Sequence, residues 1–239
     1  MRQAPAVPIA TFLIAVCLAA LSPASRHLLR AAGETTGCTV TAVISGKDYS
    51  TVEEEGKENV REKGKEGLRK ALEQGFKKLK FKTDAPGVKD KLDKAVEEAF
   101  AKNFDGLTVS VLDFGPDSID KTDNVWTVKA TFDEYTVIVL PHKAEKEDPA
   151  LTNHEQGHKT IAEMTVEFAK KKMKAMVEAA GCDEAAIRAA ISAAGALAGE
   201  VQDAADKDYD SKTDHGKTGG ANGQDPAAKA AFAAASAGK

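Results

Sequence analysis

The chain has 239 residues and a formal net charge of −4, from 33 Lys and Arg against 37 Asp and Glu. Hydrophobic residues make up 42% of the sequence and aromatic residues only 5%, so a core must be built mainly from aliphatic side chains. This mild acidity argues against a nucleic-acid-binding protein, which would carry a basic patch or stripe.

The first residues predict a targeting signal. Arg2 precedes an apolar run over residues 9–21, and Ser22-Pro23-Ala24 then supplies small residues. An apolar run this short, ended by small residues, is typical of a secretory signal peptide rather than a membrane span. We therefore expect a signal peptide at 1–24, a secreted product (extracellular or periplasmic) and no stable membrane span after cleavage. The alternative is an uncleaved anchor.

Two cysteines, Cys38 and Cys182, follow the expected cleavage point. In an oxidising compartment an even pair predicts a disulfide, and the alternative is two buried free thiols. Residues 25–37 are polar and irregular, which predicts a flexible N-terminal segment before a domain at 38–216.

The first half of the domain predicts one strand and two charged helices. Thr39–Ser45 is β-branched and ends at a glycine, as a strand does. Ser50-Thr51-Val52-Glu53 has the spacing of a capping box, which predicts a helix start. Apolar residues then recur at helical spacing in two stretches, at Leu68, Leu72, Phe76 and Leu79 and at Val88, Leu92, Val96 and Phe100. We expect these helices only to cover one side of the domain.

Three further strands are predicted over 107–111, 125–132 and 135–140, where apolar residues alternate with polar ones or β-branched residues cluster. Because these segments lie close together in the chain, they predict an antiparallel sheet. The expected fold class is α+β, with a small antiparallel sheet packed on one functional helix and additional charged helices.

The functional helix begins at Asp148-Pro149, where Asp148 can cap the first N–H groups and proline suits the first helical position. It is expected to run to Ala180, with Gly181 as its stop. An alanine-rich helix is expected over 183–206, followed by a loop over 209–216. The Gly-, Ala- and Lys-rich remainder, 217–239, predicts a low-complexity disordered tail.

This helix contains His154-Glu155-Gln156-Gly157-His158, an H-E-x-x-H motif. Residues four apart lie about 40° apart around a helix and one turn along it, so both imidazoles can reach one Zn²⁺ ion. Glu155 can then take a proton from a water molecule that the metal activates. The alternative is two core histidines beside an exposed glutamate.

A third metal ligand must come from elsewhere, because catalytic zinc usually takes three protein ligands. Glu163 fails, since five residues past His158 it is turned by about 140° on the same helix. The loop over 209–216 offers His215, with Asp210 and Asp214 as alternatives. In the same loop Tyr209 can donate a hydrogen bond to an oxyanion. The alternative is an ordinary polar turn.

A second block follows the H-E-Q-G-H motif: Tyr209-Asp210-Ser211-Lys212-Thr213-Asp214-His215-Gly216. Together the two motifs resemble a bacterial family of secreted zinc-dependent proteases that is known by a domain-of-unknown-function label. That family carries H-E-Q-x-H and, later, Y-D-x-x-T-x-H-G. The resemblance extends from about Val125 to Gly216. It implies a zincin-like metallopeptidase in which His215 is the third zinc ligand. The charged helices before residue 104 and the tail depart from that family.

The expected function is therefore a secreted zinc metallopeptidase, a hydrolase whose catalytic residues are Glu155 and Tyr209 and whose metal ligands are His154, His158 and His215. Its partner is a peptide or protein substrate, for which the segment 135–140 is a candidate edge strand. The sequence predicts no oligomeric state. One alternative is a non-catalytic zinc- or partner-binding secreted domain on the same scaffold, and another is a charged helical surface protein in which the motif is accidental.

Overall fold

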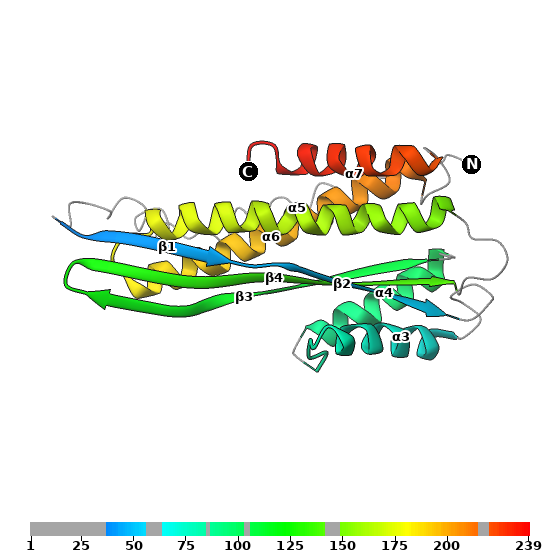
Figure 1. Ribbon diagram of the computed structural model, residues 1–239, viewed down its shortest axis with the longest axis horizontal. Coiled ribbons are helices and arrows are strands. Elements are labelled where there is room, and N and C mark those ends of the chain that lie inside the picture. The colour runs from blue at the N-terminus through cyan, green and yellow to red at the C-terminus, as the bar shows by residue number, and fades with distance from the viewer. Residues whose placement is uncertain (1–36, 56–63, 85–86, 103–105, 142–148, 215–219) are drawn as a thin grey trace, which may run out of the picture. The chain divides into compact units, whose positions relative to one another are not determined.

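The computed structural model describes residues 37–55, 64–84, 87–102, 106–141, 149–214 and 220–239 (Figure 1). The predicted signal peptide at 1–24 and all but the last residue of the predicted flexible segment at 25–37 lie outside the described residues. The described residues from Thr39 to Lys239 belong to one compact unit.

A long central strand, β4 (Val125–Pro141), organises the sheet. On one side it pairs antiparallel with β3 (Leu107–Thr122). On the other side β1 (Thr39–Ser45) pairs with its first half and β2 (Asp48–Glu55) with its second half, both parallel to β4. The sheet is therefore mixed, and the predicted antiparallel arrangement holds only for β3 and β4. The α+β class is confirmed.

One helix prediction and one strand prediction are wrong. The Ser50–Glu53 segment, predicted as a helix start, belongs to β2. The segments 125–132 and 135–140 are one continuous strand, because Asp133 and Glu134 keep their pairing with β3 rather than forming a turn. Since this strand is central, the segment 135–140 is not an edge strand, and the edges of the sheet are β3 and the β1–β2 pair.

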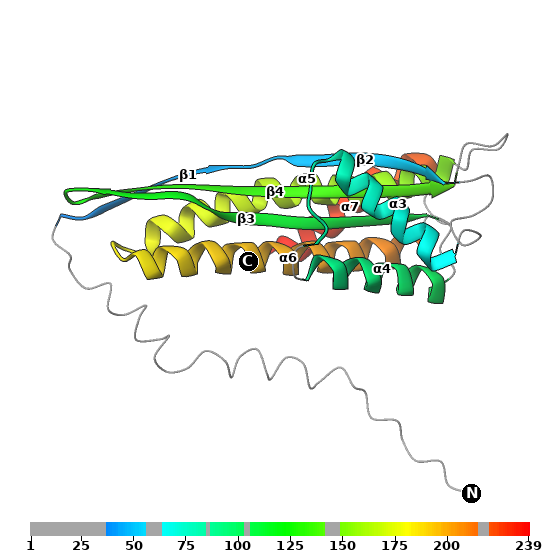
Figure 2. The same cartoon turned by 90° about the horizontal axis from the view of Figure 1, so that it is seen from below.

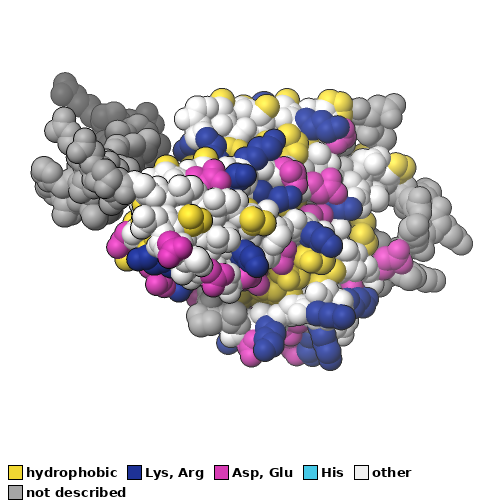
Figure 3. All heavy atoms as spheres, turned by 60° about the vertical axis from the view of Figure 1, so that its left-hand side comes forward, with side chains coloured by type: hydrophobic (Ala, Val, Ile, Leu, Met, Phe, Trp, Pro, Cys, Tyr) yellow, Lys and Arg dark blue, Asp and Glu magenta, His cyan; other side chains and the backbone are white. Residues whose placement is uncertain are grey.

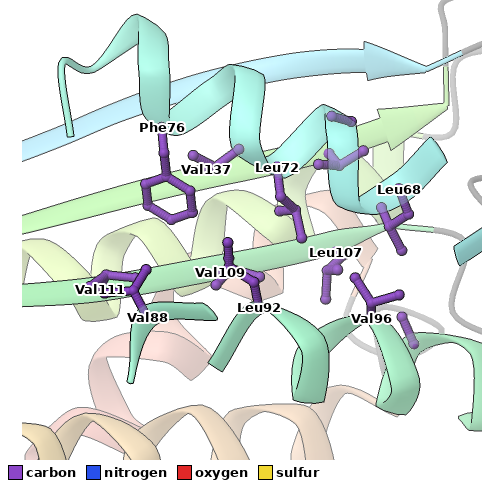
Figure 4. Close-up of a cluster of buried hydrophobic side chains, with 13 residues drawn as sticks. Leu68, Leu72, Phe76, Val88, Leu92, Val96, Leu107, Val109, Val111 and Val137 are labelled. Carbon is purple, nitrogen blue, oxygen red and sulfur yellow. The ribbon is translucent and has the colours of Figure 1, made fainter. Parts of the chain in front are cut away.

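The two charged helices are confirmed as α3 (Gly64–Lys78) and α4 (Val88–Lys102). They cover the β2 end of one sheet face and do not extend over the β1 end of that face (Figures 1 and 2). Their apolar stripes meet the sheet in a single cluster (Figure 4). Its labelled members are Leu68, Leu72, Phe76, Val88, Leu92, Val96, Leu107, Val109, Val111 and Val137.

The opposite face is covered by α5 (Pro149–Ala179) and α6 (Glu184–Thr213). Pro149 is the first residue of α5 and Gly181 follows its end with a φ of 75°, as predicted. Asp183 caps α6, since its carboxylate accepts the Ala186 N–H at 2.7 Å. However, α6 continues seven residues beyond the predicted end at residue 206, so most of the predicted 209–216 loop is helical.

The predicted disordered tail instead contains a helix, α7 (Gly220–Ser236). It packs on α5 and α6, and Ala228, Ala231 and Phe232 bury against Ile161 and Tyr209 (Figure 1). Alanine has the highest helix propensity of all residues, so an alanine-rich segment with an apolar stripe can fold where a neighbouring helix pair covers that stripe. The compact unit therefore extends to Lys239 rather than ending at residue 216.

The surface carries both signs of charge. Lys and Arg side chains are interspersed with Asp and Glu on the face in Figure 3, and the described part of that face shows no continuous basic stripe. Among the helices of the described residues, none is both long enough and apolar enough to span a membrane.

Candidate metal centre

The two motif histidines lie one turn apart near the start of α5 and face α6. Their Nε2 atoms converge on a single oxygen, Asp210 Oδ1, at 3.2 Å from His154 and 3.0 Å from His158. Among the described residues, these three side chains are the one group of three or more His, Cys, Asp or Glu whose donor atoms lie close enough to share a metal ion. His154 is buried, whereas Asp210 is 29% exposed, so the cluster is open to solvent on the α6 side.

The opposite ring nitrogens are held by α6. His158 Nδ1 lies 2.8 Å from Asp206 Oδ1, and His154 Nδ1 lies 3.2 Å from Thr213 Oγ1. The Thr213 hydroxyl already donates to the carbonyl of Tyr209, so it accepts from His154. A carboxylate likewise only accepts. Each Nδ1 therefore carries a proton, so a metal ion could take the Nε2 lone pairs in place of any proton there, as metal-ligating histidines require.

His158 lies between two carboxylates. Burial opposes its charged form, but hydrogen bonds to Asp206 and Asp210 outweigh burial and hold the pKa of His158 well above its usual value. The carboxylates of Asp206 and Asp210 can thus stabilise either a proton or a metal cation at His158. Binding a metal would release the proton from Nε2.

Tyr209 supports both histidines from behind. Its ring stacks on His154 at a centroid distance of 4.9 Å and meets the His158 ring edge-on at 5.0 Å. Its hydroxyl oxygen lies 3.1 Å from the His154 carbonyl oxygen and 2.8 Å from Gln224 Oε1, and either of these oxygens can accept its one O–H hydrogen bond. Burial, followed by the charge of Glu155, raises the pKa of Tyr209, so the hydroxyl stays protonated. The oxyanion role stays a prediction, and this geometry favours a positioning role.

The glycine inside the motif has a packing reason. A Cβ atom at Gly157 would lie 2.1 Å from the Tyr209 hydroxyl oxygen and 2.4 Å from Cζ. Only a residue without a side chain allows α5 and Tyr209 to approach this closely. The H-E-x-x-H motif alone predicted neither the close packing at Gly157 nor Tyr209 as the contacting residue.

The Glu155 side chain is buried in contact with the start of β3. It is 4% exposed, and its Oε2 accepts a hydrogen bond from Thr108 Oγ1 at 2.5 Å, at the start of β3. Its Oε1 lies 2.7 Å from the position that a Cβ atom would take at Gly106. The carboxylate is therefore fixed between α5 and the first residues of β3, next to His154 in the chain.

The predicted third ligands fare differently. Asp210 joins the cluster. Asp214 is exposed at the C-terminal end of α6, where its N–H bonds the Asp210 carbonyl, and it is not part of the cluster. His215 and His142 lie outside the described residues, so the assignment of His215 stays a prediction. Glu163 is exposed and pairs with Lys159 at 3.6 Å, which agrees with its exclusion.

Three supporting residues escaped the sequence reasoning: Asp206, Thr213 and Thr108. Asp206, Asp210 and Thr213 lie on one face of α6, at spacings of four and three. That spacing was visible in the sequence, but its meaning depended on extending the helix through residue 213. The contact of Thr108 with Glu155 joins residues 47 positions apart and has no local signal.

Both Cys38 and Cys182 are disulfide-bonded, which is the state predicted for this pair and not the free-thiol alternative. Disulfides persist mainly in secreted proteins and other proteins of oxidising compartments.

Asp206 offers a test of this arrangement. We expect Asp206→Asn to weaken zinc binding about 10- to 100-fold, because a neutral amide no longer holds the Nδ1 proton of His158 with a charge. The measurement is a zinc Kd from competition with a chromophoric chelator. Asp203→Asn is the matched control, since Asp203 lies exposed about one turn earlier on α6. Equal affinities for all three proteins would contradict a supporting role for Asp206.

Residues 116–216 match a family described as bacterial protein of unknown function (DUF922). The matched segment begins inside β3 and ends two residues after Asp214, so it contains the histidines, Glu155, Asp210 and every α6 residue that supports them. No curated protein and no solved structure matches the chain. The matched segment thus includes the candidate site and the helix pair that carries it.

Proposed function

We propose that this protein is a secreted zinc-dependent metallopeptidase with zinc held by His154, His158 and Asp210. His215 is a proposed additional or alternative ligand of the same zinc ion. One observation carries the proposal. The Nε2 atoms of two histidines and a carboxylate oxygen converge on one point, while both Nδ1 atoms are occupied by hydrogen-bond partners. Two ring nitrogens and a carboxylate oxygen that meet in this way form a donor set that suits a metal cation, which would take the place of the proton on His158 Nε2.

The donor set fits zinc. Two imidazole nitrogens and one carboxylate oxygen match the three-ligand sites of zinc hydrolases, which leave a fourth position for water. Zinc bound there would polarise that water molecule and the substrate carbonyl. The partial exposure of Asp210 and Asp206, at 29% and 31%, leaves the cluster accessible to solvent.

Glu155 is the proposed general base. It follows His154 directly, and Thr108 and Gly106 fix its carboxylate against β3. A carboxylate held in this way would accept a proton from the attacking water and later deliver it to the departing amine. Tyr209 keeps the His154 ring in place through stacking and through its bond to the His154 carbonyl.

Secretion is part of the proposal. The N-terminal sequence has the pattern of a signal peptide, and the disulfide-bonded state of Cys38 and Cys182 suits an oxidising compartment. A peptide or protein substrate remains the proposed partner.

Metal analysis tests the site directly. We expect one zinc per chain in the purified protein, and its loss in His158→Ala, because that change removes one of the two imidazole ligands. Elemental analysis of Asp210→Ala and His215→Ala then identifies the third ligand, and Asp214→Ala is the matched control from the same end of α6. A wild-type chain without zinc, even after incubation with the metal, would overturn the site.

A non-catalytic zinc-binding domain is the second candidate. The observation that favours it is the burial of Glu155, whose carboxylate already accepts a hydrogen bond from Thr108. Such a domain would hold zinc without turnover, so it passes the metal analysis and fails a hydrolysis assay.

A further inference from the structure

A second acidic feature lies between the sheet and the helix pair. Asp48, the first residue of β2, stands directly opposite Glu134 in β4, and opposed residues on neighbouring strands present their side chains on the same face. That face is the one covered by α5 and α6, because Glu134 Oε1 accepts a hydrogen bond from the amide of Gln202 in α6. Glu134 is fully buried and Asp48 is half-buried.

Two buried carboxylate oxygens of this pair, Glu134 Oε2 and Asp48 Oδ1, make no hydrogen bond of suitable distance and angle with any of the described residues. Leaving such an oxygen unsatisfied in the interior costs the full desolvation of that group. Two of them side by side across one strand pair demand a common explanation.

The surroundings add negative charge. Burial, followed by the charge of Asp206, raises the pKa of Glu134 to about 8. Burial, followed by the charge of Glu163, raises the pKa of Asp48 to about 6, although Lys159 acts in the opposite direction. Each carboxyl group thus lies where a cation or a proton would be stabilised. The Ser110 hydroxyl bonds Thr136 at 2.8 Å and also lowers the pKa of Glu134, so it places a neutral oxygen beside this pair.

We propose that Asp48 and Glu134 bind a hard divalent cation of the calcium type, at a site separate from the histidine cluster. The donors are oxygens alone, two carboxylates with a neighbouring hydroxyl, and calcium accepts such sets together with water in flexible geometry. The histidine cluster has imidazole donors, which suit zinc instead. The inference does not depend on the proposed peptidase activity, because it concerns a different set of side chains.

Thermal unfolding in added calcium chloride tests the site. For the wild-type protein we expect the unfolding midpoint to rise by about 5 to 10 °C at a calcium concentration one hundred times Kd. Glu134→Gln and Asp48→Asn should each abolish that rise. Asp133→Asn is the matched control and should keep it, since Asp133 is adjacent in β4 but lies on the opposite face of the sheet and accepts the Lys47 N–H there.

His158→Ala separates this site from the proposed zinc centre. It should keep the calcium-dependent rise even when it has lost zinc. Asp48→Asn changes a half-buried residue and so stays informative if Glu134→Gln fails to fold. No rise in the wild-type protein, a rise retained in either Asp48→Asn or a folded Glu134→Gln, or a rise lost in His158→Ala would overturn the proposal. If the wild-type protein shows no rise, a proton bound to the Glu134 carboxyl group explains its burial.

Discussion

Glu155→Gln is expected to retain one zinc per chain and to lower kcat/KM for peptide hydrolysis by about 10²- to 10⁴-fold, the usual contribution of a general base. Glutamine has nearly the same shape, and its amide oxygen can still accept the hydrogen bond from Thr108. The substitution therefore removes the capacity to take a proton while the packing between α5 and β3 is preserved. The measurement is hydrolysis of an unfolded protein substrate, with zinc content determined on the same samples.

Glu163→Gln is the matched control, because Glu163 lies on the same helix and is exposed. It removes the same charge about two turns away and should leave kcat/KM unchanged. Equal loss in both variants would point to a general charge effect rather than to a base. Full activity in Glu155→Gln would remove Glu155 from the proposed mechanism, and a wild-type protein that holds zinc but hydrolyses nothing would favour the non-catalytic candidate.

Local periodicity predicted the helices that have an apolar stripe. The apolar residues of α3 and α4 recur every three or four positions, and in both helices the apolar stripe that they form is buried, as that spacing predicts. Strand β2 was missed because Ser50-Thr51-Val52-Glu53 fits both a capping box and an alternating strand. Its pairing with β4, which lies some 86 residues further along the chain, decided between the two structures. A local pattern carries no information about that partner.

The C-terminal half was misread for another reason. Residues 207–213 are rich in aspartate and lysine, and 220–236 are mostly Gly, Ala and Ser, so neither segment shows a strong apolar period. Their helices are fixed by tertiary contacts, with Tyr209 and Phe232 buried against α5. Propensity is a weak signal that packing overrides, and in both segments packing extended helical structure that composition had assigned to loop or tail.

The candidate site was predicted where one helix carries it. His154 and His158 follow from a spacing of four and Glu155 from the motif, whereas Asp210 was an alternative to His215, the predicted third ligand. The geometry of α6 brings Asp210 Oδ1 within 3.2 Å of both Nε2 atoms, and it leaves His215 untested. The supporting residues were not predictable, because their contacts cross from α5 to α6 and from α5 to β3.

Gly157→Ala tests how closely the fold and the site are joined. The added methyl group would lie 2.1 Å from the Tyr209 hydroxyl oxygen, and Tyr209 is fully buried, so the ring must move. We expect the free energy of unfolding to fall by about 1 to 3 kcal/mol, the usual cost of overpacking. A displaced ring also loses its stacking on His154, so zinc affinity should fall at least about tenfold, as for other losses of support around a ligand.

Gly199→Ala is the matched control within the neighbouring helix. A Cβ atom there would make only an ordinary contact, at 3.6 Å from Leu112 Cδ1. Alanine favours a helix interior over glycine by about 1 kcal/mol, so this variant should be slightly more stable than the wild-type protein and should bind zinc unchanged. Chemical denaturation and a zinc competition titration measure both quantities. A Gly157→Ala protein as stable as Gly199→Ala would show that α5 and Tyr209 are less tightly packed than in the structure. A destabilised Gly157→Ala protein with unchanged zinc affinity would show that the Tyr209 contact does not support zinc binding.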